Sequence, residues 1–158
     1  MRFERTYPFS REALWLALTD RRALEQRWLE ADFEPLAGRR FVLRDLARGP
    51  FGGLVRGEVL EAVRPLRLRH SWSVGGRPPS SVTWELHEIE GGTRIVLEHR
   101  GFRGTGGRLW ALVHCLTWRR YLAGELPEAA ELFDRRGPDA AFPKPPRHVR
   151  LGRLAYLL

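Results

Sequence analysis

Three histidines are the residues of this chain best suited to chemistry. His70 and His99 lie in segments where apolar and polar residues alternate, and each shares its phase with leucines, namely Leu68 and Leu97. Both imidazoles are therefore expected to point into the core. His114 lies in a mainly apolar segment with helical spacing. An imidazole titrates near neutral pH, so each could act as an acid or base, and the three could cluster. Taken singly, each also suits a core position with satisfied hydrogen bonds.

The segment from Arg108 to about Ala123 is predicted to form the longest helix. It is apolar around most of its circumference, which predicts a buried helix. Spacings of four, three and four residues place four side chains on one face, with Arg108 and Arg119 roughly opposite. Those four are Trp110, His114, Thr117 and Tyr121. Two aromatic rings, one imidazole and one hydroxyl suit a mainly apolar pocket with a few polar anchors, but they could also simply fill a core.

The predicted sheet presents a matching set of side chains to this helix. Period-2 alternation directs His70 and Trp72 inward from one strand, Trp84 from the next and His99 from a third. The candidate ligand-binding residues are therefore His70, Trp72, Trp84, His99, Trp110, His114, Thr117 and Tyr121. If the pattern is right, all eight line one space.

Motifs for enzymatic or metal chemistry give no assignment. Ser80 and Ser81 lack a nucleophile-elbow setting, and the glycine-rich stretches lack the lysine of a phosphate-binding loop and dinucleotide-binding spacing. Cys115 is the only cysteine, which excludes an internal disulfide and a cysteine-based zinc site. We therefore assign no catalytic residue, metal ligand or cofactor, and the balance favours a binding protein over an enzyme.

The order of predicted elements indicates an α+β fold. A first strand over residues 2–7 ends at Pro8, and Ser10 is a suitable N-cap for a helix to about Thr19. A short helix from Arg21 follows. Strands are then expected at residues 31–35, 39–46, 54–63, 66–74, 80–89 and 93–100, with Gly91-Gly92 as a tight hairpin. Short connections predict an antiparallel sheet of about seven strands, with the first strand at its edge.

An ordered set of landmarks carries a family resemblance. They are Leu14 to Asp20, Trp28-Leu29, Gly57-Glu58-Val59, Pro65, Ser71-Trp72, Val82 to Leu86, Gly91-Gly92-Thr93 and His99 to Phe102. Over roughly residues 1 to 125, this order resembles the START-like (SRPBCC) helix-grip superfamily. It is most similar to the branch named for the activator of the ninety-kilodalton heat-shock protein ATPase, through the C-terminal domain of that activator. The resemblance implies a curved sheet wrapped around the long C-terminal helix, with a ligand cavity between them.

Three functions stay open at this point. The first is binding of a small hydrophobic or amphipathic molecule in the cavity. The second is a protein-interaction module, similar to a co-chaperone, with no ligand. The third is an enzyme that uses a cavity histidine as acid or base, because relatives with this fold differ in function. A continuous cavity favours the first, a filled core the second, and a cavity with an imidazole near a second polar group the third.

Composition limits the partners and the location. The chain has 158 residues and a net charge of +8, but its arginines occur as isolated pairs among acidic residues. No stretch combines basic clusters with stacking aromatics, so nucleic-acid binding is not expected. The N-terminus is charged, and no apolar run is long enough to span a bilayer. We therefore expect a cytoplasmic protein without a transmembrane segment.

The sequence divides into a domain over residues 1–133 and a proline-rich, basic extension over residues 134–158. Within the extension, Leu151, Leu154, Ala155 and Leu158 are spaced as one face of a short amphipathic helix, with arginines largely between them. Exposed apolar side chains at a free terminus are a liability. We expect this segment to dock on its own domain or on a partner in a homodimer. Membrane or partner binding and simple disorder are the alternatives.

Overall fold

The computed structural model describes residues 1–28, 30–44, 53–103 and 106–142. The elements along the chain are β1 (Arg2–Tyr7), α1 (Arg11–Thr19), α2 (Arg21–Arg27), β2 (Glu30–Asp32), β3 (Arg40–Arg44), β4 (Leu54–Val63), β5 (Arg67–Val74), β6 (Ser80–Ile89), β7 (Gly92–Arg100), α3 (Gly107–Ala123) and α4 (Glu125–Ala140). None of the helices in the described ranges is long and apolar enough to cross a membrane.

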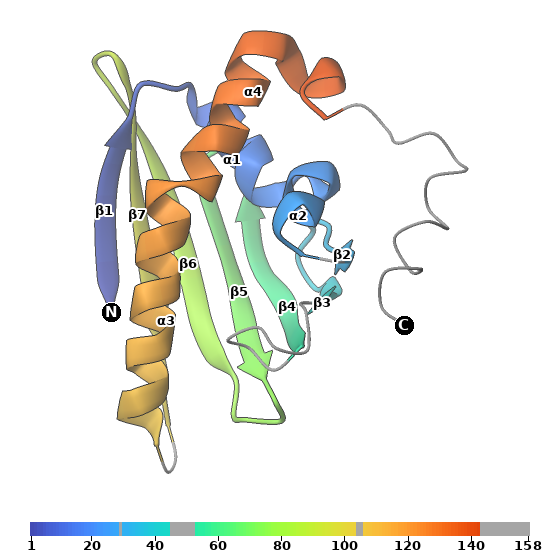
Figure 1. Ribbon diagram of the computed structural model, residues 1–158, viewed down its shortest axis with the longest axis vertical. Coiled ribbons are helices and arrows are strands. Elements are labelled where there is room, and N and C mark those ends of the chain that lie inside the picture. The colour runs from blue at the N-terminus through green and yellow to red at the C-terminus, as the bar shows by residue number, and fades with distance from the viewer. Residues whose placement is uncertain (29, 45–52, 104–105, 143–158) are drawn as a thin grey trace.

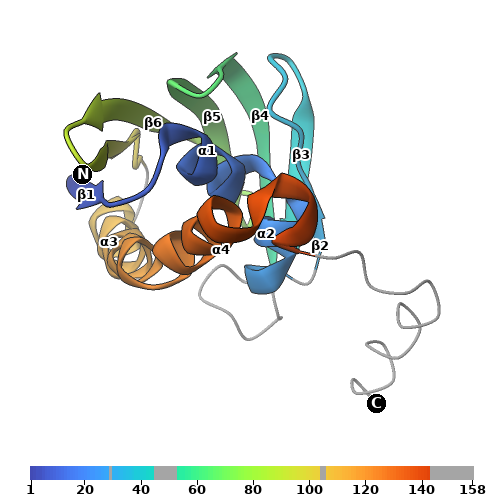
Figure 2. The same ribbon diagram turned by 90° about the horizontal axis from the view of Figure 1, so that it is seen from above.

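Seven strands form one antiparallel sheet in the order β1-β7-β6-β5-β4-β3-β2. Short hairpins join β4 through β7, so strands adjacent in sequence are adjacent in space. β1 returns to pair with β7, with Arg2 opposite Glu98. The sheet curves, and all four helices lie on its concave side (Figures 1 and 2). The prediction of an α+β helix-grip fold is therefore confirmed, including the sheet of seven strands and the two short helices after the first strand.

Local capping fixes the two short helices where the sequence predicts them. The Ser10 hydroxyl accepts a hydrogen bond from the Ala13 backbone N–H at 3.2 Å, which satisfies one free donor at the start of α1. Asp20 ends α1 and caps α2, because its carboxylate accepts from the Arg22 N–H at 2.8 Å. Leu29, part of the Trp28-Leu29 landmark, lies outside the described residues.

The core fills the space between the sheet and these helices. Leu14 and Trp15 on α1 are completely buried, and α1 packs against α4. Leu18, Trp28, Phe33 and Phe41 are also buried at this end of the sheet. The Tyr7 hydroxyl donates a hydrogen bond of 2.6 Å to the Leu122 carbonyl, which ties β1 to the end of α3.

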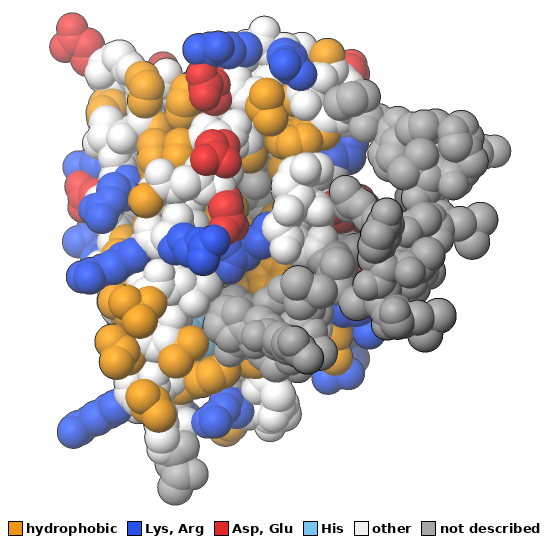
Figure 3. Space-filling view, viewed as in Figure 1, with side chains coloured by type: hydrophobic (Ala, Val, Ile, Leu, Met, Phe, Trp, Pro, Cys, Tyr) orange, Lys and Arg blue, Asp and Glu red, His pale blue; other side chains and the backbone are white. Residues whose placement is uncertain are grey.

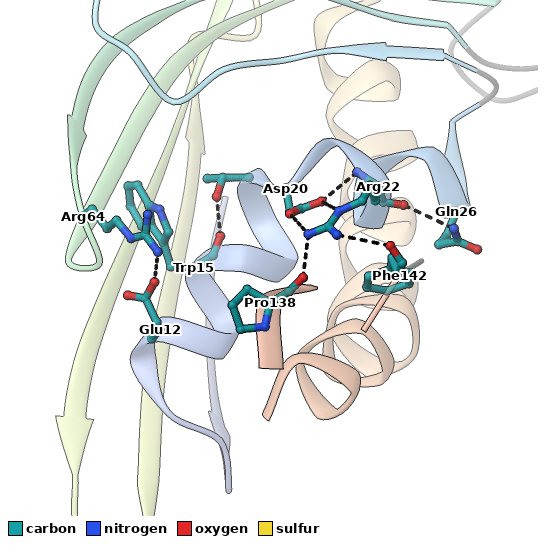
Figure 4. Close-up of polar contacts among 9 residues, drawn as sticks. Glu12, Trp15, Asp20, Arg22, Gln26, Arg64, Pro138 and Phe142 are labelled. Carbon is teal, nitrogen blue, oxygen red and sulfur yellow. Dashed lines mark hydrogen bonds and ion pairs between the residues drawn. The ribbon is translucent and has the colours of Figure 1, made fainter. Parts of the chain in front are cut away.

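The helix α4 extends beyond the elements expected from the sequence. Gly124, with φ −125° and ψ −79°, separates it from α3. A polar clasp holds its end (Figure 4): the Arg22 guanidinium donates to the Pro138 carbonyl at 2.6 Å and to the Phe142 carbonyl at 3.2 Å. Asp20 orients that guanidinium through bonds of 2.7 and 3.0 Å.

The position of α4 bears on how the chain is divided. α4 runs across residue 133, and Phe142 packs edge-on against Phe133 with ring centroids 5.2 Å apart. The predicted division between residues 1–133 and 134–158 stays a prediction. The predicted amphipathic segment over residues 148–158 lies outside the described residues.

One expectation about α3 is wrong. The sequence predicts a helix buried around most of its circumference, yet Leu109, Leu112 and Leu116 are 68%, 55% and 58% exposed. The physical reason is that α3 has the concave face of the sheet on one side only (Figure 2). A helix packed on one side buries one stripe and leaves the opposite stripe to solvent.

Candidate ligand-binding site

A pocket of about 300 Å³ lies between the concave face of the sheet and the helices. Its lining comes from α1, α2, strands β3, β5 and β6, the end of α3, and α4. The lining residues are Ala17, Leu18, Ala23, Leu24, Gln26, Arg27, Trp28, Phe33, Phe41, Leu43, Leu68, His70, Trp72, Trp84, Trp118, Tyr121, Glu125, Glu128, Ala129, Leu132 and Phe142. The volume is at the lower end of the range for small-molecule pockets.

Aromatic rings form most of the wall of this pocket. Trp118 on α3 packs against Trp84 and Trp72 of the sheet, with ring centroids 5.4 and 5.5 Å apart. On the opposite side, Phe33 packs edge-on against Phe41 at 5.0 Å. The contacts of Trp118 with Trp84 and of Phe33 with Phe41 are edge-to-face and that of Trp118 with Trp72 is tilted, so ring packing makes this wall apolar.

Gly57 on β4 makes room for one of these rings. A Cβ atom built there would lie 2.3 Å from the Phe41 ring and 2.3 Å from the Ser71 carbonyl oxygen. Any side chain at this position would therefore displace Phe41, which lines the pocket. The glycine landmark of the sequence thus has a steric role beside the site.

His70 supplies a polar atom to an otherwise apolar wall. Its Nδ1 lies 3.1 Å from the Ser71 carbonyl oxygen, which only accepts, so Nδ1 carries the proton. Nε2 is then an acceptor, and it has no hydrogen-bond partner among the described residues. Burial lowers the pKa of His70 to about 4, against a small opposing effect of the hydrogen bond to Ser71. The imidazole is therefore neutral near pH 7.

Polar residues of α2 and α4 gather at one side of the pocket. Arg27 forms an ion pair with Glu125, and both are partly exposed. The Arg27 guanidinium also lies over the rings of Trp28 and Tyr121, 5.3 and 5.2 Å from their centroids. Burial raises the pKa of the Tyr121 hydroxyl well above its usual range. Because these polar groups reach solvent, we call this side of the pocket, between α2 and α4, its entrance.

The other two candidate histidines lie behind the pocket wall. The Trp72 indole donates to His114 Nε2 at 3.1 Å, and His114 Nδ1 lies 2.9 Å from the Trp110 carbonyl oxygen. The Trp118 indole donates to His99 Nδ1 at 3.0 Å. Because an indole N–H only donates, each histidine must offer an unprotonated nitrogen. Burial lowers the pKa of both, that of His99 to about 2, so both are neutral.

The pair of Ser80 and His99 does not form a nucleophilic dyad. His99 Nδ1 accepts from Trp118, so its proton is on Nε2, which lies 2.7 Å from the Ser80 hydroxyl oxygen. The Ser80 hydroxyl in turn donates to the Trp72 carbonyl at 3.0 Å. A base that activates serine must accept the serine proton, whereas here His99 Nε2 donates its proton to the Ser80 oxygen. These hydrogen bonds among Trp118, His99, Ser80 and Trp72 hold the side chains in place.

The structure brings four of the eight candidate residues together around the pocket. These are His70, Trp72, Trp84 and Tyr121. His99 and His114 contact each other behind the wall, with ring centroids 5.0 Å apart, and Trp72 separates them from His70. Trp110 is half-buried at the opposite end of α3, beneath the Arg77 guanidinium at 4.7 Å. The Thr117 hydroxyl donates to the Val113 carbonyl of its own helix at 2.9 Å.

Trp118 is the main lining residue that the sequence analysis missed. It follows His114 by four residues and precedes Tyr121 by three, the same spacing that defined the predicted stripe. The buried face of α3 includes His114, Trp118 and Tyr121, whereas Thr117 lies at its edge. The predicted stripe passes through Thr117 at the edge of the buried face, and it therefore leaves Trp118 out. Trp28, Phe33 and Phe41 belong to the core and also line the pocket.

The pocket offers groups that can contact a ligand. Among the described residues, no group of three metal-ligating side chains comes together. The pocket offers an apolar aromatic wall, one neutral imidazole acceptor, one tyrosine hydroxyl and an ion pair at its entrance. Together these groups can hold an apolar molecule and orient one polar substituent.

Comparison with protein families identifies the relatives of this fold. The model of the family described as activator of Hsp90 ATPase homolog 1-like protein matches residues 8–131. The chain belongs to this family. The predicted resemblance to the SRPBCC superfamily and its activator branch is therefore confirmed. Membership in the activator of Hsp90 ATPase homolog 1-like family supports a ligand-binding or interaction module in general terms. No curated protein matches the chain at a significant level.

Solved structures of family-like proteins agree with the fold. Protein MLL2253 from Mesorhizobium loti is 26% identical, with a TM-score of 0.71 over 83% of this chain and 96% of that one. PFC0360w, an HSP90 activator from Plasmodium falciparum, is 28% identical, with a TM-score of 0.52 over 63% of this chain and 72% of that one. The Aha1 dimer from Colwellia psychrerythraea is 16% identical, with a TM-score of 0.66 over 88% and 98%, and shows the fold alone.

Proposed function

We propose that this protein binds a small, mainly apolar molecule with a planar ring system and one hydrogen-bond donor. The observation that carries the proposal is the aromatic pocket of about 300 Å³ with the neutral His70 imidazole in its wall. A cavity lined by aromatic rings with few polar groups is typical of small-molecule sites. His70, Trp72, Trp84 and Tyr121 are the predicted ligand contacts that the pocket supports, joined by Trp118.

The polar groups define the ligand class. His70 Nε2 can only accept a hydrogen bond, so a ligand hydroxyl or N–H is favoured over a bare carbonyl at that atom. An anionic group is disfavoured in the apolar interior, because a buried charge needs a partner. At the entrance, the Arg27 guanidinium already pairs with Glu125 and stacks on Tyr121, so it does not call for an anionic group on the ligand. A phenol-like or fused-ring alcohol therefore fits best.

Calorimetric titration with two matched probes tests this proposal. 1-Naphthol carries a hydroxyl donor, and 1-methoxynaphthalene has the same rings without one. We expect 1-naphthol to bind ~2- to 10-fold more tightly, the worth of one hydrogen bond. The variant His70→Phe keeps an aromatic ring but removes the acceptor, so it is expected to bind both probes equally. Equal binding by the unaltered protein would contradict the role of His70.

A pair of alanine variants tests whether the probe enters the pocket. Ala129 on α4 lines the pocket, and Ala123 at the end of α3 is exposed outside it. Ala129→Trp should fill the pocket and abolish 1-naphthol binding, whereas Ala123→Trp should leave it unchanged. If neither variant alters binding, or if the unaltered protein binds neither probe at millimolar concentration, the proposal is wrong.

The second candidate function is an interaction module that acts on a chaperone. The observation that favours it is the 28% identity to PFC0360w, which is described as an HSP90 activator. Purified protein would then stimulate the ATPase of its host HSP90-type chaperone, and Ala129→Trp would not affect that stimulation. Stimulation by the unaltered protein together with absent probe binding would favour this function over ligand binding. The same pocket variants therefore separate the two candidates.

A further inference from the structure

An exposed apolar stripe runs along the outer side of α3. Leu109, Leu112 and Leu116 are spaced three and four residues apart and are each more than half exposed. In Figure 3, hydrophobic side chains gather over the lower part of this helix, with Lys or Arg side chains above and below them. We call Leu109, Leu112 and Leu116 the leucine stripe. Such a cluster on one helix face marks a contact with another surface.

The charges around the leucine stripe have one sign. α3 contains three arginines and no acidic residue. Arg108 precedes the stripe, Arg119 and Arg120 follow it on the same side of the helix, and all three are exposed. None of them forms an ion pair with any described residue, although most arginines of the sheet do. The leucine stripe is therefore flanked at both ends by cations that have no partner within the described part of the chain.

This pattern distinguishes between possible occupants. A second copy of α3 packed against the first would bring arginines towards arginines with no acid between them. Three partly exposed leucines also fall short of the ~800 Å² that each partner buries in a stable protein interface. The chain beyond Phe142 is itself basic, with Lys144 and three arginines before Leu154. Like charge disfavours it as the cover.

We propose that the leucine stripe binds the surface of an anionic lipid bilayer. A helix that lies in a membrane interface places apolar side chains among the acyl chains and arginines at the level of the phosphates. The stripe and its flanking arginines have this arrangement, and a bilayer needs no large complementary interface. The net charge of +8 adds a long-range attraction to the same surface. The inference is independent of the pocket and does not require that a ligand bind there.

Vesicle co-sedimentation with the full chain tests the proposal. We expect the protein to sediment with phosphatidylglycerol vesicles and not with phosphatidylcholine vesicles, and to dissociate as salt is raised. The double variant Leu112→Asp, Leu116→Asp should weaken binding by ~10-fold or more, because it removes the inserted side chains. The matched control is Leu36→Asp, since Leu36 is 64% exposed in the turn between β2 and β3. It should bind like the unaltered protein.

Replacement of the flanking cations separates insertion from simple charge attraction. Arg119→Gln with Arg120→Gln should weaken binding to phosphatidylglycerol and flatten its salt dependence. Unchanged urea denaturation would show that each variant is folded. The proposal is overturned if the unaltered protein does not sediment, if Leu36→Asp weakens binding as much as the stripe variant, or if the stripe variant binds normally. It is also overturned if the stripe variant instead dissociates a dimer in sedimentation velocity, which would assign the stripe to a second copy.

Discussion

The buried histidines predict that folding stability falls steeply in mild acid. His70 and His99 are 5% and 0% exposed, and burial lowers their pKa values from 6.5 to about 4 and about 2. The Nδ1 atom of each ring is engaged by a neutral partner, the Ser71 carbonyl for His70 and the Trp118 indole for His99. Protonation in the folded state would leave a buried charge without a counterion. The folded protein therefore resists protonation, and the unfolded chain does not.

The sign and size follow from this difference in proton binding. A folded-state pKa below that of the unfolded chain means that stability is complete above about pH 6.5 and falls as the pH drops towards the folded-state values. Each histidine that stays neutral in the fold then costs about 1.4 kcal/mol of stability per pH unit. Between about pH 7.5 and pH 5, His70 and His99 each contribute a loss of about 2 kcal/mol. His114, whose pKa is also lowered by burial, acts in the same direction.

Urea denaturation followed by tryptophan fluorescence measures this loss. The free energy of unfolding should fall by at least about 4 kcal/mol from pH 7.5 to pH 5. His70→Phe should lose about 2 kcal/mol less over the same range, because it removes one of the protonation sites. A free energy of unfolding that stays constant between pH 7.5 and pH 5 would refute the neutral, buried network. So would a pH dependence that His70→Phe leaves intact.

Three further outcomes are expected. Trp28 is 4% exposed, so Trp28→Ala should lower the free energy of unfolding by ~3 to 5 kcal/mol in urea denaturation, and a loss under ~1 kcal/mol would contradict its place in the core. Arg22→Ala should release the end of α4 and reorient Phe142, so 1-naphthol affinity should fall several-fold in calorimetry; equal affinity would show that the clasp does not shape the pocket. Deletion of residues 143–158 should change the melting temperature or the oligomeric state if this segment docks, and an unchanged value of both would exclude docking.

The strands could be predicted from sequence because, with alternation of period two, the apolar side chains fix which face of each strand points inward. Once Leu68 and Leu97 are inside, His70 and His99 must be inside as well, and the structure has them buried. The first helices were equally clear, since Ser10 and Asp20 mark their starts by capping. In each case, a local rule and the burial of apolar side chains point the same way.

The long helix could be predicted only in part, because it carries two apolar stripes. One contains Trp118 and Tyr121, and the other contains Leu112 and Leu116. The predicted stripe identifies the inward side through His114 and Tyr121, but apolar residues on both sides also predict burial around most of the helix, which a helix packed on one side does not have. The pocket was also misplaced along α3: it lies at the end near Tyr121, because Gly124 turns the chain into α4 there.

The NMR signals of the tryptophan indole N–H groups, followed while a ligand is added, test the central claim most directly. The chain has six tryptophans. Four of them line the pocket, Trp28, Trp72, Trp84 and Trp118, while Trp15 and Trp110 do not. In a proton–nitrogen correlation spectrum titrated with 1-naphthol, we expect the four indole signals of the pocket to shift together and the other two to stay. Absence of any shift, or a shift largest at Trp15 or Trp110, would contradict a ligand site between the sheet and the helices.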